Sequence, residues 1–138
     1  MGYDIYLAGP WEKHTEEYAP FYKTKIKNAF PDKKFFDPET RPAQKREGEI
    51  WFKDDIYGLQ NTKYFVGLVP PFSFSGSCIE LGIFYQMHCK EQGQPLEQIV
   101  VIWPVMVKPR HDSFLKQVTK NIVDTPEKAI EKLKDILK

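Results

Sequence analysis

The 138-residue sequence has few cysteines, no long apolar run and almost no net charge, and each shortage excludes a class of protein. Its two cysteines, Cys78 and Cys89, are too few for a disulfide scaffold, and their spacing matches no zinc or redox motif. No apolar run approaches the length of a membrane span, and the first residues lack the basic and apolar regions of a signal peptide. We therefore expect a cytoplasmic protein with no bound metal, no cofactor and no membrane partner.

Positive and negative charges are nearly balanced, with 20 Lys and Arg against 19 Asp and Glu. A formal charge of +1 creates no overall field that would attract a polyanion, so binding to nucleic acid is not expected. Hydrophobic residues make up 41% of the chain, which is enough to build a core. The length suits one domain, and we expect a single domain over residues 1–138.

Short apolar segments with strand character alternate with segments of helical spacing. The expected strands cover residues 4–8, 34–36, 64–69, 98–103 and 121–123. The expected helices cover residues 15–30, 50–61 and 79–88, and a last helix is capped by Thr125 and starts at Pro126. This alternation predicts a doubly wound α/β fold of the flavodoxin-like or Rossmann-like type, with a mostly parallel five-stranded sheet and helices on both faces. The polar residues 39–49 are expected to form a loop.

Doubly wound sheets bind their ligands beyond the carboxyl ends of the strands. Three segments of interest follow strands and should lie there: residues 6–11, Asp37 with Pro38, and residues 70–80. Asp55 falls on an expected helix that would lean over the same crevice. The sequence thus predicts one site built from several segments.

Glu80 is expected in the first turn of a helix, where backbone N–H groups and the helix dipole favour an anion. The residues from Ser77 to Glu80 also fit the S-x-x-E capping box, in which the glutamate only satisfies backbone donors. Tyr6 can equally be a strand aromatic, and Asp55 a charge on a helix surface. From these residues alone, a structural role and a functional role both stay open.

Three motifs occur in order along the chain. They are Ile5-Tyr6-Leu7-Ala8-Gly9-Pro10, Asp55-Ile56-Tyr57-Gly58-Leu59 and Gly76-Ser77-Cys78-Ile79-Glu80-Leu81-Gly82. The ordered set, which spans residues 5–82, resembles the nucleoside 2-deoxyribosyltransferase family, including the related deoxynucleoside 5′-monophosphate N-glycosidases.

The resemblance implies an enzyme that acts on the N-glycosidic bond of a small nucleoside or nucleotide, with a free nucleobase as the second substrate. Glu80 would be the nucleophile that forms a covalent glycosyl ester, Tyr6 would hold its rotamer, and Asp55 would be the acid and base. Such a division of roles between two carboxyl groups is that of retaining glycosidases. We expect Glu80 to stay ionised and Asp55, shielded by Trp51 and the substrate base, to hold a proton near neutrality.

Substrate contacts are also implied by the resemblance. Asp37 and Trp11 are candidates for contacting the base, although Asp37 can simply cap a turn and Trp11 can pack in the core. The other candidates for substrate binding are Gly9, Ser73, Ser75, Gly76, Ser77, Lys108, Arg110 and Ser113. The family builds its sites at subunit interfaces, so we expect a homo-oligomer.

Phe74 occupies the position six residues before Glu80, where free-nucleoside transferases often have an acidic residue and the monophosphate N-glycosidases a serine. Two activities therefore stay open: transfer of deoxyribose to a base, and hydrolysis of (deoxy)nucleoside 5′-monophosphates. A third possibility from another class is a nucleotide-binding sensor without catalysis.

Overall fold

The computed structural model describes residues 2–45, 48–69, 76–104 and 113–137, with the side chains of residues 44, 113 and 114 excepted. Five strands form one parallel sheet in the order β2-β1-β3-β4-β5. The strands are β1 (Tyr3–Ala8), β2 (Phe35–Phe36), β3 (Thr62–Leu68), β4 (Ile99–Ile102) and β5 (Asn121–Val123). The predicted doubly wound α/β fold is therefore confirmed.

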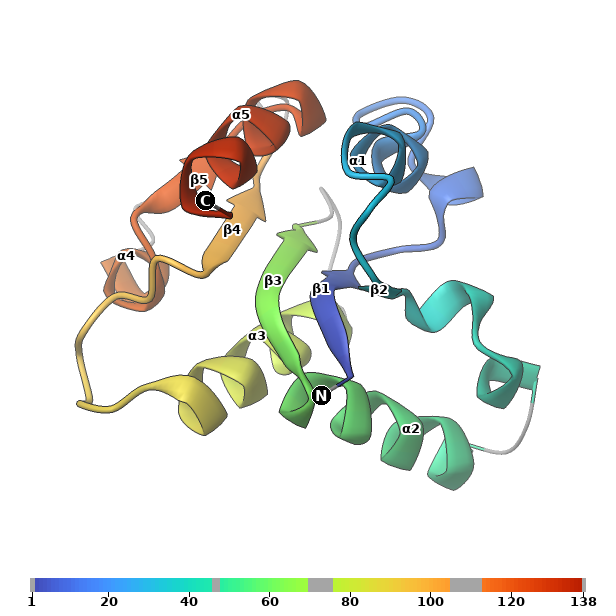
Figure 1. Ribbon diagram of the computed structural model, residues 1–138, viewed down its shortest axis with the longest axis horizontal. Coiled ribbons are helices and arrows are strands. Elements are labelled where there is room, and N and C mark those ends of the chain that lie inside the picture. Colours follow the sequence, from blue (N-terminus) through green and yellow to red (C-terminus); the bar gives the residue numbers. More distant parts are fainter. Residues whose placement is uncertain (1, 46–47, 70–75, 105–112, 138) are drawn as a thin grey trace.

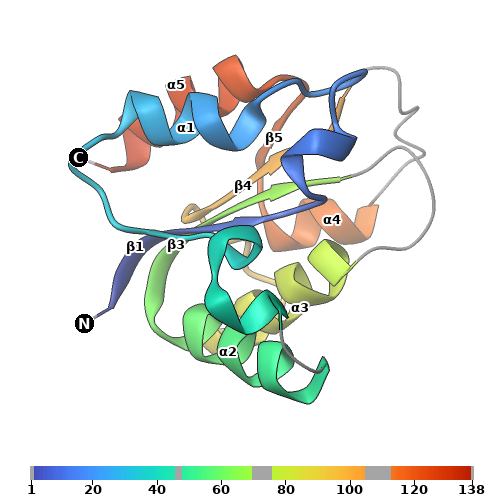
Figure 2. The same ribbon diagram turned by 90° about the vertical axis from the view of Figure 1, so that its right-hand side faces the viewer.

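Helices cover both faces of the sheet (Figures 1 and 2). On one face lie α1 (Tyr22–Ala29) and α5 (Pro126–Ile136), and on the other lie α2 (Gly48–Gln60), α3 (Gly76–His88) and α4 (Ser113–Val118). Three short 3-10 segments, η1 (Glu12–His14), η2 (Pro38–Thr40) and η3 (Pro42–Lys45), complete the described elements. In the described part of the chain, no helix has both the length and the apolar character that crossing a bilayer requires.

The alternation of side chains along β1 divides the core in two. Ile5 and Leu7 pack into the cluster under α1 and α5, whereas Tyr6 and Ala8 point to the face covered by α2 and α3. This follows from the two-residue period of a strand. Because both faces are covered, all four side chains are buried.

The topology places a crevice at the carboxyl ends of β1 and β3. After β1 the chain passes through α1 to β2 at one edge, and after β3 it passes through α3 to β4 on the other side. The connections leave these neighbouring strands in opposite directions, which is the arrangement that opens a binding crevice in this class of sheet. The carboxyl ends of β1 and β3 therefore lie side by side at this edge of the sheet.

Several element boundaries differ from the prediction. The helix expected from residue 15 begins only at Tyr22, because Pro20 interrupts the pattern and Phe21 adopts a left-handed φ of 54°. The expected loop over residues 39–49 contains the end of η2, all of η3 and the first two residues of α2. The sequence pattern did not predict α4, whereas α5 begins as predicted, with the Thr125 hydroxyl accepting the Lys128 N–H at 3.1 Å.

Candidate active site

Tyr6 and Glu80 are joined by a hydrogen bond from the Tyr6 hydroxyl to Oε2 of Glu80. The Tyr6 ring is fully buried between two parallel aromatic rings, Phe36 at 5.1 Å and Phe65 at 5.6 Å between centroids. A ring stacked on both sides has little rotational freedom, so its hydroxyl is held in one direction. The described residues give Oε1 of Glu80 no hydrogen bond, which leaves this oxygen for another partner.

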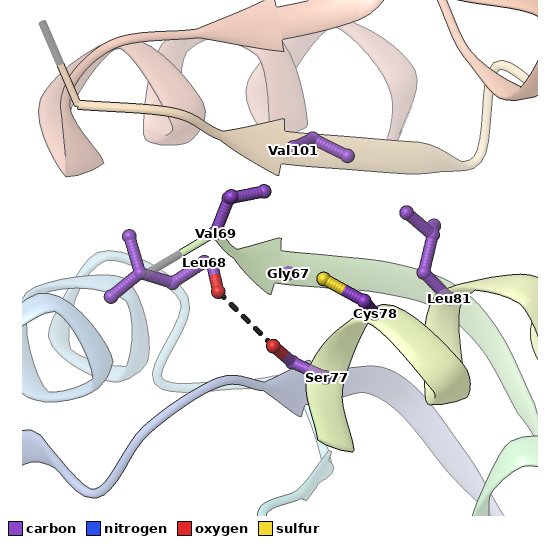
Figure 3. A pocket seen from close by; sticks show the side chains of 7 residues that line it. All are labelled: Gly67, Leu68, Val69, Ser77, Cys78, Leu81 and Val101. Carbon is purple, nitrogen blue, oxygen red and sulfur yellow. Dashed lines mark hydrogen bonds between the residues drawn. The ribbon is translucent and has the colours of Figure 1, made fainter. Parts of the chain in front are cut away.

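The position of Glu80 on α3 excludes the capping box. Because α3 begins at Gly76, Glu80 is the fifth residue of the helix and lies beyond its first turn. Ser77 is inside the helix, and its buried hydroxyl donates to the carbonyl oxygen of Leu68 at 3.3 Å (Figure 3). The structural alternative for Glu80, together with the expected first-turn position, is therefore wrong, and Ser77 instead anchors α3 to the end of β3.

A small cavity beside this anchor is too small for an organic ligand. It measures about 10 Å³ and lies between α3 and the ends of β3 and β4 (Figure 3). Such a volume is near the minimum for one water molecule. An organic ligand must therefore bind in a different and larger pocket.

Glu80 and Asp55 line the same pocket between α2 and α3, which has a volume of about 130 Å³. The two helices contribute residues with the same spacing. The lining residues are Trp51, Phe52, Asp55, Ile56 and Leu59 from α2, and Gly76, Ile79, Glu80 and Ile83 from α3. The walls are thus apolar except for two carboxyl groups.

The i, i+3, i+4, i+7 spacing of residues 52, 55, 56 and 59 and of residues 76, 79, 80 and 83 places each set on one helix face. Sequence reasoning named both acidic residues but missed most of the apolar wall, notably Phe52, Ile79 and Ile83. The shared spacing of the two helices was the signal that could have revealed it.

Asp54 and Asp55 are adjacent in sequence, but their side chains have different surroundings. Both carboxylate oxygens of Asp54 accept hydrogen bonds from Arg41, each at 2.8 Å. Asp55 is buried and faces the pocket instead. Only Asp55 is therefore placed to act on a ligand beside Glu80.

The pKa of Glu80 is raised to about 7, mainly by burial and in part by the negative charge of Asp55. The Tyr6 hydrogen bond and the positive charge of Lys23 act in the opposite direction. Burial and the nearby Glu80 likewise raise the pKa of Tyr6, which keeps its hydroxyl protonated as a donor. Glu80 is thus not the fully ionised carboxylate that we expected, and it titrates near neutrality.

Asp37 has the structural role that the sequence left open. Its side chain caps η2 by accepting the Glu39 N–H at 3.1 Å, and it pairs with Lys23 and Lys27, each at 2.8 Å. Burial would raise its pKa, but the two lysines outweigh burial and lower it. All of these contacts occupy Asp37, and it does not line the pocket.

Trp11 lies outside both the core and the carboxylate pocket. It is 43% exposed, with the Lys13 ammonium 5.1 Å from its ring centroid. It lines a separate groove of about 570 Å³ together with residues of η2 and η3. Its expected packing in the core is therefore wrong, and its contact with a base stays a prediction.

The remaining candidates fall into three groups. Gly9 has a φ of 148°, and a Cβ there would lie 2.5 Å from the Tyr22 hydroxyl, so it is needed for the turn after β1. Gly76 lines the pocket. Ser73, Ser75, Lys108 and Arg110 lie outside the described residues, as does the side chain of Ser113.

No protein-family model matches the sequence, and a search of curated proteins gives no significant match. Among the described residues, no three His, Cys, Asp or Glu side chains come together as a metal site would require. The chemistry of the site therefore follows from its own side chains, Tyr6, Asp55 and Glu80. Two carboxyl groups in one apolar pocket, one hydrogen-bonded by a fixed phenol, can supply a nucleophile and a proton donor.

Proposed function

We propose that the protein is a nucleoside 2-deoxyribosyltransferase. It would cleave the N-glycosidic bond of a 2′-deoxynucleoside through a covalent ester on Glu80 and pass the deoxyribosyl group to an acceptor base. The observation that carries the proposal is the placement of Glu80 and Asp55 in one apolar pocket, with Tyr6 bonded to Glu80. The ordered motifs of the sequence support the same activity.

In the first step, an oxygen of the ionised Glu80 attacks C1′ of the sugar as the C1′–N bond breaks. The electron pair of that bond goes to the base nitrogen, and Asp55 donates a proton so that the base leaves neutral. The transition state resembles an oxocarbenium ion, as in retaining glycosidases. The step yields a glycosyl ester, a free base and an ionised Asp55.

In the second step, Asp55 takes a proton from the acceptor base, whose nitrogen attacks C1′ and breaks the ester bond. The carboxylate of Glu80 is released and the enzyme returns to its starting state. Water in place of the acceptor base would give hydrolysis by the same route. Transfer and hydrolysis therefore differ only in what reaches C1′ from the pocket.

The roles of the two carboxyl groups follow from their neighbours. The Tyr6 hydroxyl donates a hydrogen bond to Glu80, which favours the ionised form of Glu80 and so the nucleophile. Asp55 and Glu80 repel each other as anions, so the pair favours a state that holds a single proton. The raised pKa of Glu80 places this proton on Glu80 in the free protein, so the first step requires it to pass to Asp55 when the substrate is bound.

A base-exchange assay tests the proposal. The protein is incubated with each 2′-deoxynucleoside or its 5′-monophosphate and a different free base, and the products are separated by chromatography with mass detection. A new nucleoside supports transfer, whereas free deoxyribose or its 5-phosphate would assign the protein as a hydrolase instead. Binding without any product, in the wild type as in the Glu80→Gln control, would overturn the proposal in favour of a nucleotide sensor.

A further inference from the structure

Arg41, which directly follows η2, makes an unusually complete set of contacts. Its Nε and Nη2 donate to the two oxygens of Asp54 at 2.8 Å each, and its Nη1 donates to the Tyr3 hydroxyl at 2.9 Å. The guanidinium carbon lies 4.3 Å from the centroid of the Phe36 ring. Each side of this pair is partly shielded from solvent, with 26% of the Arg41 side chain and 19% of the Asp54 side chain exposed.

This pair fixes α2 at the position next to Asp55. A bidentate bond between a guanidinium and a carboxylate defines an angle as well as a distance, so it restrains both the rotation and the translation of the helix. A second close contact supports the same placement, because the Phe36 ring would lie 2.6 Å from a Cβ added at Gly58 of α2. The η2–η3 segment and β2 together hold α2 by Arg41 and Phe36.

We infer that Arg41 is a positioning residue that acts through Asp54 to set the direction in which Asp55 faces the pocket. The inference rests on the proposed function, since it concerns the acid and base of that reaction. Arg41 itself does not line the pocket, and its three nitrogens each donate a hydrogen bond to Asp54 or Tyr3. A displacement of α2 by a fraction of an ångström would leave the pocket in place but move the proton donor away from the base.

Substrates with different leaving groups test this inference. A nucleobase needs a proton from Asp55, whereas 4-nitrophenolate leaves the sugar without one. For Arg41→Lys we expect kcat with a deoxynucleoside to fall at least about tenfold, with KM nearly unchanged, because misplacing a reacting group costs this much or more. With 4-nitrophenyl 2-deoxyriboside, the rate of the first, burst release of 4-nitrophenolate should stay within about twofold of wild type, because a general acid contributes little to that leaving group.

Three further variants keep the test decisive. Asp54→Asn should reproduce the pattern of Arg41→Lys if that protein is unstable, and Arg41→Lys should cost nothing more in an Asp55→Asn background. The control is Lys25→Gln, which removes the 2.8 Å ion pair between α1 and Glu127 on the opposite face and should change neither rate.

Equal losses with both leaving groups, or an additional loss in the Asp55→Asn background, would overturn the inference, as would an unchanged rate in both Arg41→Lys and Asp54→Asn. Those results assume that the wild type cleaves deoxynucleosides. Failure of the wild type to cleave any of them would overturn the proposed function, and the inference with it.

Discussion

Asp37 is buried and Glu80 is half-buried, and the charged groups next to them have opposite signs. Asp37 lies between Lys23 and Lys27, which overcome the effect of burial and lower its pKa. In the described part of the chain, Glu80 forms no ion pair, and burial and the charge of Asp55 raise its pKa to about 7. The negative charge of Asp37 is thus balanced by two neighbouring lysines, whereas Glu80 has no ion-pair partner in the described part of the chain.

This difference separates a structural carboxyl group from a candidate catalytic one. A paired carboxylate stabilises the fold, and removing it would leave the buried Lys23 with only its longer 3.2 Å ion pair to Glu39. A buried carboxyl group beside a second acid costs stability at neutral pH and is suited to proton transfer or nucleophilic attack. Two adjacent carboxyl groups of α2 also differ in position, since Asp54 is paired with Arg41 and Asp55 lines the pocket.

The sharpest test of this contrast replaces each carboxylate by its amide. Glu80→Gln should lower kcat by at least about 10⁴-fold, as expected when a nucleophile is removed. Asp37→Asn should keep most of the activity of each folded molecule but lower the free energy of unfolding by about 3 kcal/mol, because it breaks a buried ion pair. Base-exchange rates and urea unfolding measure the two effects. Similar activity losses in Glu80→Gln and Asp37→Asn would contradict the distinction between a catalytic and a structural carboxyl group.

The second prediction concerns Asp55. Asp55→Asn should lower kcat with deoxynucleosides by about 10²–10⁴-fold, the usual contribution of a general acid and base. The variant should also shift the acidic limb of kcat/KM to lower pH, because the charge of Asp55 raises the pKa of Glu80. A pH–rate profile of wild type and variant shows both effects. A profile in which no limb changes would count against the assigned role.

Stability should depend on pH in opposite directions for the two regions. The pKa of Glu80 is about 7 in the folded protein against an ordinary value of 4.5, so between these values only the unfolded state loses the proton. The free energy of unfolding should therefore fall by up to roughly 3 kcal/mol as the pH rises through this range. Asp37, whose pKa is lowered, contributes stability above its ordinary value of 3.8 that is lost on acidification.

Urea unfolding between pH 3 and pH 8 measures these two contributions. In Glu80→Gln the decline toward neutral pH should disappear and the loss in acid should remain. If the amide leaves the neutral decline intact, another group causes it, and the contrast between the two carboxyl groups is weaker than the structure indicates.

Replacing Tyr6, which is bonded to Glu80, should reduce activity less than replacing Asp55 does. Tyr6→Phe removes the hydrogen bond that lowers the pKa of Glu80, so the acidic limb of the pH–rate profile should move above its wild-type position. We expect activity at pH 7 to fall about tenfold, which corresponds to the loss of one hydrogen bond to a charged group. Kinetics with Phe65→Leu, which alters the stack but keeps the hydroxyl, provides the control.

The two faces of the sheet also differ in exposed apolar surface. Among the described residues, eight large apolar side chains are exposed, and six of them lie on α2 and α3: Ile50, Trp51, Phe52, Tyr57, Ile79 and Met87. Exposed apolar side chains concentrated on two neighbouring helices are what a subunit interface would need, so the expected homo-oligomer would form through α2 and α3. Light scattering should give a mass above that of one chain for the wild type and a smaller mass for Phe52→Glu, whereas Phe21→Glu near α1 should leave the mass unchanged.

Much of the fold could be predicted from local sequence patterns. The strands and α5 carry strong local signals, such as the Thr125 cap and the apolar stripe through Ala129 and Leu133. The start of α1 was missed because helical spacing continues through Thr15–Ala19, although Pro20 and Phe21 break the backbone before Tyr22. The six-residue α4 is too short for its apolar positions to show a helical period in the sequence.

The candidate site was less accessible to sequence reasoning. The three central residues were found, but the pKa of Glu80 depends on burial and on Asp55, which approaches it from another helix. The role of Arg41 depends on the path of η2 and η3, which no local pattern specifies. The sequence therefore identified the candidate reacting groups, whereas the effects of neighbouring charges on them required the three-dimensional arrangement.

The covalent ester on Glu80 is the central claim, and intact-protein mass spectrometry tests it directly. The protein is mixed with a deoxynucleoside in the absence of an acceptor base, quenched in acid and weighed, with Glu80→Gln treated in the same way. We expect the wild type to gain the mass of one deoxyribosyl group, mapped to the peptide that contains Glu80, and the variant to gain nothing. Turnover without any adduct, or the same adduct on the variant, would contradict the account.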